Sequence, residues 1–224
     1  MTAEINTIIV KEYGLKAGAS VVGIAASKDF GLAPDGFKPS DKLEGCLSVV
    51  VLGAPFPRES LLKNTAEYTE IRNGMVEKMD DIAKEVTKQI IRKGFKAKAI
   101  TSVGAKGYNG AISLKHAAEL AGLGIINRNY LLTNPEYGNL LFLSAVLTNA
   151  DLIPDKKAEY TVCDNCNNCV KMCPAKALDN PDLFDKKKCA KICIKFVGKL
   201  EFKCFLCRKV CPYCFGKLNK TKSN

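Results

Sequence analysis

Cysteine is almost missing from the first two thirds of this chain. Of the 11 cysteines in 224 residues, only Cys46 precedes residue 163. The sequence also lacks a basic start followed by an apolar run, so we expect no signal peptide. No continuous stretch reaches the about 18 to 20 apolar residues that span a bilayer. We therefore expect a cytoplasmic protein without membrane contact, whose thiols serve metal or redox chemistry rather than disulfides.

The cysteine distribution divides the chain into two parts. Hydrophobic residues make up 47% of the sequence and charged residues 25%, as in ordinary globular proteins. A chain of this length can form one large domain, or a core domain with a small appended module. Because the dense cysteines begin just after the polar segment DLIPDKKAE, we predict a first domain over residues 1–158 and a cysteine module over 159–224.

Hydrophobic patterning predicts a mixed α/β first domain with a central sheet. The continuous apolar run 47–56 is typical of a buried central strand. Between Thr65 and Gly94, apolar residues recur every three or four positions, which indicates one face of a long amphipathic helix. Those positions are Ile71, Met75, Met79, Ile82, Val86 and Ile90. We also expect helices over 3–16 and 112–124, strands over 20–25 and 96–100, and a hairpin that turns at 134–138.

The run CDNCNNCVKMCP at 163–174 has the spacing C-x2-C-x2-C-x3-C-P. Three thiolates at this spacing can hold one face of a cubane 4Fe–4S cluster, while the fourth leads away to another cluster. The spacing therefore predicts that Cys163, Cys166 and Cys169 hold one cluster and that Cys173 belongs to a second.

A shorter run near the C-terminus supplies thiolates for both clusters. Cys204, Cys207 and Cys211 precede Pro212, but Glu201 stands where symmetry would place a further cysteine. In two-cluster modules the last cysteine of each run ligates the other cluster. We therefore expect Cys211 to complete the first cluster, and Cys204 and Cys207 to hold the second.

The second cluster then needs one more thiolate beside those of Cys173, Cys204 and Cys207. Spacing alone does not choose among the remaining candidates, which are Cys189, Cys193 and Cys214. Zinc is the alternative occupant, but its sites usually pair two short knuckles across a long spacer, which these runs match poorly. Cys46, at the start of an apolar strand, is expected to be a buried small side chain.

Acidic residues are scarce near the C-terminus. From Asp182 onward, 12 Lys or Arg accompany 3 Asp or Glu, so +9 of the formal net charge of +11 lies there. A basic tail is often a nucleic-acid or acidic-partner signal, yet no recognisable nucleic-acid-binding motif accompanies these lysines. Each cluster with its thiolates carries about −2 when oxidised. We therefore interpret the lysines as compensating cluster charge and expect no nucleic-acid partner.

One long segment and the cysteine module together resemble a known superfamily. The segment is HAAELAGLGIINRNYLLTNPEYGNLLFLSAVLTNADLIPD (116–155), and its most specific parts are AGLG at 121–124 and PEYG at 135–138. With the cysteine spacing, these residues resemble the epoxyqueuosine reductase and reductive dehalogenase superfamily, and most of all its short iron–sulfur members. The resemblance extends from about Gly104 to Cys211.

This resemblance implies a cobalamin-binding domain with a nitroreductase-like fold, joined to a ferredoxin-like module with two 4Fe–4S clusters. The superfamily's odd ligand lies sixteen residues past the fourth cysteine of the first run, which selects Cys189. A low-potential donor of the ferredoxin or flavodoxin type would reduce the outer cluster, and the inner cluster would reduce the corrinoid. The activity implied is reduction of a small substrate. A bound flavin such as FMN is the alternative cofactor.

The implied proton donor departs from the superfamily pattern. Epoxyqueuosine reductases have Asp-Tyr-His at the start of the long helix, where this chain has Glu67, Tyr68 and Thr69. A glutamate can donate a proton if burial raises its pKa, and a tyrosine serves in the dehalogenases. Glu67 and Tyr68 are therefore the candidate catalytic residues. The plainer interpretation is a first-turn carboxylate beside a core aromatic residue.

Four other residues are candidates for binding the organic cofactor: His116, Asn129, Tyr137 and Gly138. A lone histidine is more often a packed or capping residue, and a Tyr-Gly pair can be a plain turn. Asn127 and Tyr130 replace small residues of the superfamily and would reshape the pocket. The chain ends ten residues after Cys214, without the helical-repeat extension of tRNA-acting relatives, so we expect a substrate other than tRNA.

Two functions follow from these expectations. The first is a corrinoid-dependent reductase that turns over its own small substrate. The second is an electron-transfer protein that delivers electrons to a corrinoid, a flavin or a partner protein without turnover. Both require the clusters, and they differ in whether an acid is placed beside the cofactor.

Overall fold

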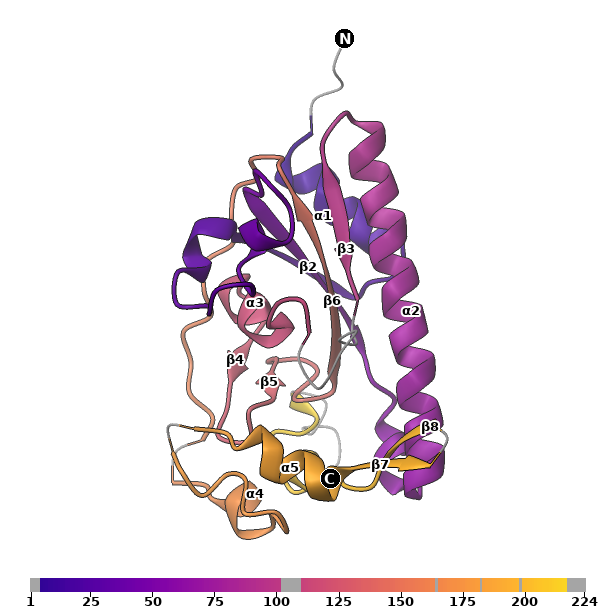
Figure 1. Cartoon of the computed structure of the whole chain (residues 1–224), viewed down its shortest axis with the longest axis vertical. Coiled ribbons are helices and arrows are strands. Elements are labelled where there is room, and N and C mark those ends of the chain that lie inside the picture. The colour runs from indigo at the N-terminus through magenta and orange to yellow at the C-terminus, as the bar shows by residue number, and fades with distance from the viewer. Residues whose placement is uncertain (1–4, 102–109, 164, 182, 198, 217–224) are drawn as a thin grey trace, which may run out of the picture. The chain divides into compact units, whose positions relative to one another are not determined.

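The computed structural model describes residues 5–101, 110–163, 165–181, 183–197 and 199–216. The chain has a mixed α/β fold (Figure 1). It forms two compact units, each built from three separate segments. Unit 1 contains Met1–Pro55, Met75–Gly124 and Phe142–Glu159. Unit 2 contains Phe56–Gly74, Ile125–Leu141 and Tyr160–Asn224. The predicted domain boundary after residue 158 lies next to the point, after Glu159, where the chain passes from unit 1 to unit 2 for the last time. Unit 2 also includes two earlier segments.

Unit 1 is organised around a four-stranded sheet in the order β1-β2-β6-β3. The strands are β1 (Val21–Ala26), β2 (Ser48–Pro55), β6 (Leu141–Thr148) and β3 (Ala97–Ile100). Antiparallel pairing joins β1 to β2 and β3 to β6. All residues of β2 except Pro55 are buried, because β2 is an inner strand with both faces covered. The predicted buried central strand is therefore confirmed.

Helices cover both faces of this sheet. Helix α1 (Thr7–Lys16) lies against Val22 of β1, whereas the end of α3 (Leu114–Leu120) lies against Gly23. Because successive strand residues point to opposite faces, α1 and α3 cover opposite faces. In Figure 1, α2 (Thr65–Arg92) and α3 lie on opposite sides of the strands. The predicted apolar face of α2 is buried at Met75, Met79, Ile82, Val86 and Ile90.

Unit 2 is made of short elements. It contains the start of α2, the two-stranded pair β4 (Ile125–Ile126) and β5 (Leu132–Thr133), and the elements of the cysteine-rich segment. These last are α4 (Asn168–Lys171), α5 (Lys186–Cys193), β7 (Ile194–Val197), β8 (Lys199–Phe202) and α6 (Leu206–Lys209). The described residues also contain 3-10 turns, at Ser27–Phe30 and Pro39–Asp41 in unit 1 and at Arg58–Leu62 in unit 2.

The predicted hairpin around 134–138 is wrong in its pairing. The apolar run before the turn, β5, pairs with β4, and the run after it, β6, belongs to the central sheet. Only the bridge between Asn134 and Gly138 is hairpin-like. Asn134 Oδ1 accepts hydrogen bonds from the backbone N–H groups of Glu136 (2.9 Å) and Tyr137 (3.0 Å), so the turn closes on itself. Each flanking run is then free to pair elsewhere.

Asp155, in the last segment of unit 1, is hydrogen-bonded to β1 through both its side chain and its backbone. Asp155 Oδ2 accepts from the backbone N–H of Ile24 (2.8 Å), and its Oδ1 lies 2.6 Å from Lys11 Nζ. The N–H of Asp155 donates to the Ile24 carbonyl (2.9 Å).

Cys46 in the same unit is buried, as predicted. None of the helices in the described residues is both long enough and apolar enough to cross a membrane.

Gly23 and Gly74 provide a matched test of this packing. A Cβ on Gly23 would overlap the carbonyl oxygen of Ala121, whereas one on Gly74, inside α2, would meet nothing within 4 Å. We expect Gly23→Ala to lower the free energy of unfolding by about 1 to 3 kcal/mol through overpacking. Gly74→Ala should raise it by about 0.5 to 1 kcal/mol, because alanine has the higher helix propensity. Urea unfolding followed by circular dichroism measures both; equal effects would contradict the described contact of α3 with β1.

Candidate metal centre

Four thiols from the two cysteine runs line one pocket in unit 2. They are Cys163, Cys166, Cys169 and Cys211. Helix α4, which contains Cys169, contacts α6, and Cys211 follows α6. Burial raises the pKa of the Cys169 thiol, and the nearby Cys163 and Cys211 thiols raise it further. The structure thus brings together the four residues that spacing assigned to the first cluster.

A second group of thiols lies between α5 and α6. Cys189 and Cys193 are one helical turn apart on α5, and Cys193 Sγ donates to the carbonyl of Cys204 (2.9 Å). Its side chain also hydrogen-bonds that of Cys189, and this bond and then burial raise the pKa of Cys193. Burial raises the pKa of Cys207 to about 11; Arg208 opposes the increase, while Cys189 and Cys204 add to it.

Cys173 and Cys214 stand apart from this second group in their hydrogen bonds. Those of Cys173, within the described residues, stay in its own loop; its Sγ accepts from the N–H of Ala177 (3.4 Å). Cys214 is buried, and its Sγ donates to Asn139 Oδ1 (3.3 Å). Burial raises its pKa to about 12. Cys214 is therefore part of the packing around Asn139.

Two buried asparagines fasten α6 to the segment 125–141. Asn129 Nδ2 donates to the carbonyl of Cys207 (3.1 Å), and Asn129 also lines the pocket of the first thiol group. Asn139 Nδ2 donates to the carbonyl of Arg208 (3.3 Å), whose guanidinium in turn donates to the Asn139 carbonyl. Asn129 was a predicted cofactor-binding residue. Asn139 was missed, because an asparagine after a Pro-Glu-Tyr-Gly turn is ordinary turn chemistry in sequence.

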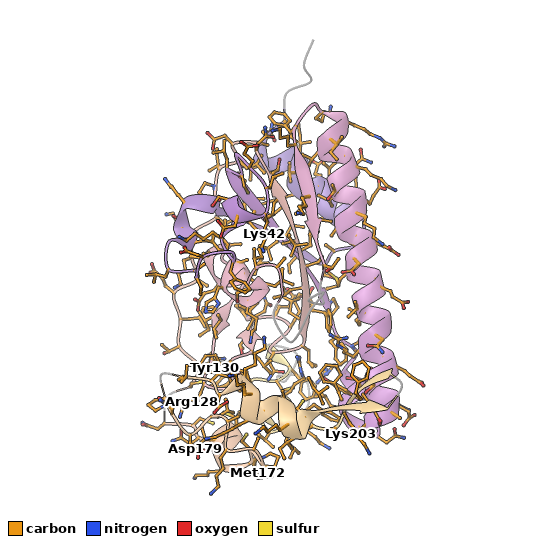
Figure 2. All side chains as sticks on the ribbon, in the orientation of Figure 1. Lys42, Arg128, Tyr130, Met172, Asp179 and Lys203 are labelled. Atoms are coloured by element: carbon orange, nitrogen blue, oxygen red, sulfur yellow. The ribbon has the colours of Figure 1, made fainter. Side chains whose placement is uncertain are left out.

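The same segment holds the stretch between the two cysteine runs. Arg128 donates to the carbonyls of Asn180 (2.8 Å) and Asp179 (3.3 Å), and Figure 2 labels Arg128 close to Asp179. Tyr130 has a φ of 55°, which is unfavourable for a residue with a side chain. Its ring stacks on that of Phe184 with centroids 5.2 Å apart, a contact that helps to offset this cost.

Tyr137 and Gly138 form the turn that meets the C-terminal end of the cysteine module. Gly138 has a φ of +60°, and any Cβ there would overlap the carbonyl oxygens of Tyr213 and Cys214. The N–H of Asn139 donates to the Cys214 carbonyl (3.0 Å). Glycine is therefore required here both for its conformation and for this close approach. Burial, and then the neighbouring Glu136, raise the pKa of Tyr137.

Tyr68 lies inside an aromatic cluster of unit 2. Its ring stacks on Phe205 with centroids 4.0 Å apart and planes 11° apart, and it meets Phe56 edge-on at 5.4 Å. Burial raises the pKa of the Tyr68 hydroxyl, with Arg208 opposing, so the phenol stays protonated at neutral pH. Next to it, Thr69 Oγ1 accepts from the N–H of Phe202 (2.9 Å). The start of α2 is thereby joined to β8 and to the loop before α6.

Glu67 lies on the surface at the start of α2. Asn64 Oδ1 accepts from the N–H of Glu67 (3.0 Å), and Glu67 Oε2 accepts from the backbone N–H (3.4 Å) and from Nδ2 (2.7 Å) of Asn64. Glu67 Oε1 is 3.3 Å from Lys63 Nζ, and the side chain is 46% exposed. This reciprocal arrangement is that of a capping box. Its contacts match the plainer interpretation of a first-turn carboxylate, and the catalytic role stays a prediction.

His116 belongs to unit 1, whereas the other three predicted cofactor-binding residues belong to unit 2. Its Nδ1 lies 2.6 Å from Ser113 Oγ, at the start of α3. Burial lowers the pKa of His116, and Glu119 opposes that shift. The imidazole is therefore mainly neutral at pH 7 and contacts the first turn of its own helix.

The donor set of both groups is made of thiols. Soft thiolate ligands select zinc, copper(I) or iron–sulfur clusters, and a cubane takes one thiolate on each of its four iron atoms. The four-thiol pocket therefore fits a 4Fe–4S cluster in ligand number and chemistry. Within the described residues, no three Cys, His, Asp or Glu side chains converge on a single-ion position.

Comparison with known proteins places the chain near one group of enzymes. No protein-family model matches it. An epoxyqueuosine reductase of Lactococcus garvieae is 27% identical over 201 residues, covering 79% of this chain and 54% of that protein. Epoxyqueuosine reductases of Bacillus subtilis and Gloeobacter violaceus are 34% and 41% identical over 119 and 81 residues, covering 48% and 36% of this chain and 31% and 25% of theirs.

Solved structures with a similar fold include an epoxyqueuosine reductase and a reductive dehalogenase. An epoxyqueuosine reductase with a modified tRNA stem loop superposes with a TM-score of 0.65 at 22% identity, covering 97% of this chain and 66% of that one. A catabolic reductive dehalogenase superposes with a TM-score of 0.59 at 22% identity, covering 75% and 25%. The chain spans about half the length of the Lactococcus relative. It is a distant homologue of the epoxyqueuosine reductases, and its fold is that of these enzymes and of reductive dehalogenases.

Proposed function

We propose that the protein is an iron–sulfur oxidoreductase with two 4Fe–4S clusters that supplies electrons for the reduction of a small substrate. The observation that supports this most directly is the pocket lined by Cys163, Cys166, Cys169 and Cys211. These thiols come from two separate runs, as expected when two half-motifs exchange a ligand. When bound, such clusters accept and release single electrons at low potential.

The second cluster is proposed to lie between α5 and α6. Support comes from the hydrogen bonds of Cys193 to Cys189 and to the Cys204 carbonyl, and from the effect of Cys189 and Cys204 on the pKa of Cys207. Cys173 is added as the fourth ligand on the evidence of its spacing. The chain's own part is to hold these thiols together and to exclude water, which Asn129 and the stacked Tyr68 and Phe205 support.

A corrinoid is the proposed organic cofactor, and a flavin such as FMN is the alternative. Support comes from the homology to epoxyqueuosine reductases and from the fold shared with reductive dehalogenases. In unit 2, Asn129 and Gly138 are engaged with the chain itself, through the Cys207 carbonyl and the Tyr213 and Cys214 backbone. The proposal of a corrinoid therefore rests on the homology, and analysis of the bound cofactor tests it.

An electron-transfer protein without its own turnover is the second candidate, and one observation favours it. Glu67 is occupied as an exposed helix cap, and Tyr68 is enclosed by Phe56 and Phe205. A general acid must come within hydrogen-bond reach of the atom that it protonates. In these positions both side chains are engaged with the chain itself and not directed at a substrate. This favours delivery of electrons to a partner as the second candidate function.

The proposed electron donor is a low-potential ferredoxin or flavodoxin that meets the outer face of α5. Lys187 and Lys191 are exposed and lie one turn apart on the side of α5 opposite Cys189 and Cys193, because residues advance 100° around a helix. A helix is about 10 to 12 Å across, side chains included. An acidic donor on this basic face would thus be one helix away from the second thiol group. We assign these lysines to a donor protein rather than to nucleic acid.

The cluster proposal predicts a defined metal content. Protein purified without oxygen should contain about eight iron atoms per chain. Replacing Cys204 and Cys207 with serine should remove the second cluster and leave about four, while Cys46→Ala, outside both thiol groups, should leave the iron unchanged. Iron assay and low-temperature EPR measure this. About one cobalt per chain supports the corrinoid; bound flavin without cobalt supports the second candidate. Zinc in place of iron would refute the proposal.

Conservative changes at the candidate acids test whether either one donates a proton. Glu67→Gln retains most of the cap, and Tyr68→Phe retains the stacked ring, so iron content and cluster reduction should stay at the level of the unchanged protein. If the protein is a reductase that uses either acid, turnover should fall about 10²- to 10⁴-fold. Stopped-flow cluster reduction and steady-state turnover are measured together. Unchanged turnover in both variants would remove Glu67 and Tyr68 as proton donors.

The donor face is tested by charge reversal. In Lys187→Glu/Lys191→Glu, the second-order rate constant for cluster reduction by a reduced flavodoxin should fall about tenfold at low salt, because steering is electrostatic. The difference should shrink as ionic strength rises. Lys84→Glu/Lys88→Glu makes the same charge change on exposed α2 positions of unit 1 and serves as the control. Equal slowing in both variants would point to net charge and against a docking face.

A further inference from the structure

The second cluster has one candidate thiolate more than a cubane needs, because the four thiols of the second group are joined by Cys173, which is added from spacing alone. The candidates are Cys173, Cys189, Cys193, Cys204 and Cys207. We propose that Cys193 is a reserve ligand of the second cluster that can replace Cys189. This inference rests on the proposed iron–sulfur function and adds to it a site with two interchangeable thiolates.

The first argument is the register of α5. Asp185 Oδ1 accepts from the N–H of Lys188 (2.9 Å) and fixes the start of the helix. Cys189 and Cys193 follow at positions that are four residues apart, and side chains at this separation lie on one face. Ala190, beside them, is buried. The helix therefore points two thiols, not one, toward the same side.

The second argument is the way in which Cys193 is held against Cys204. Helix α5 ends at Cys193, and the antiparallel pair β7 and β8 returns the chain at once. The N–H of Lys203 donates to the Cys193 carbonyl (2.7 Å), while Cys193 Sγ donates to the Cys204 carbonyl (2.9 Å). These two bonds join Cys193 to the start of the second run from both its backbone and its side chain.

The third argument is that the two thiols already touch. The side chain of Cys193 hydrogen-bonds that of Cys189, and Cys193 Sγ also donates to the carbonyl of Cys204. A change of ligand would thus exchange two hydrogen-bonded thiols on one face of α5. In that exchange the iron–sulfur bond to Cys189 breaks and one to Cys193 forms. Cys193 releases its proton, Cys189 takes one up, and no electron is transferred.

Serine variants test the proposal by iron content and by EPR of the reduced protein. Cys189→Ser should retain about eight iron atoms per chain, with altered EPR features from the second cluster. Cys193→Ser should also retain about eight. The double variant Cys189→Ser/Cys193→Ser should fall to about four, with the first cluster's signal still present. That remaining signal shows that the double variant is folded.

A matched double variant controls for the simple loss of two cysteines. Cys214 belongs to the packing around Asn139, so Cys189→Ser/Cys214→Ser should keep about eight iron atoms. A fall to about four in Cys189→Ser alone would overturn the inference, since Cys193 would then be unable to replace it. A fall in Cys193→Ser alone would also overturn it, because Cys193 would be an obligatory ligand. Absence of clusters from the unchanged protein would instead refute the proposed function.

Discussion

The candidate metal centre depends on two amide-to-carbonyl hydrogen bonds, from Asn129 to Cys207 and from Asn139 to Arg208. Helix α6 has four residues, far fewer than an isolated helix needs, so it depends on partners outside itself. The asparagines bond two of its carbonyls from a segment about seventy residues earlier, and the Arg208 carbonyl also accepts from the N–H of Cys211 (3.4 Å). Because Cys207 and Cys211 lie in and after α6, their places relative to the other thiols follow from this attachment.

The cysteine-rich segment is consequently not a self-contained module. Unit 2 also contains the start of α2, where Tyr68 stacks on Phe205 and Thr69 accepts from Phe202. It also contains the segment 125–141. The two asparagines of this segment bond α6, and its Arg128 bonds the stretch after Cys173. So few short helices could not bury a core of their own. Two segments that precede the cysteine runs in the sequence therefore contribute residues to the candidate metal centre.

The sequence predicted those features that depend on local pattern. The apolar run of β2, the stripe of α2 and the grouping of Cys163, Cys166 and Cys169 follow from periodicity or spacing, and the structure has all of them. The pairing of the 134–138 turn was wrong, because the turn closes on Asn134 and leaves β6 to the sheet. Asn139 was missed because its partner is distant, and nothing near it in sequence marks a buried amide.

The register of α5 constrains how this protein can vary. One inserted residue between Cys189 and Cys193 would rotate the second thiol by about 100° and turn it from its neighbours toward the lysine side. A deletion would do the same in the other direction. Natural variation in length should therefore avoid this helix and accumulate in the loops that flank it, so that the distance between these two cysteines is a more durable signature than the lysines around them.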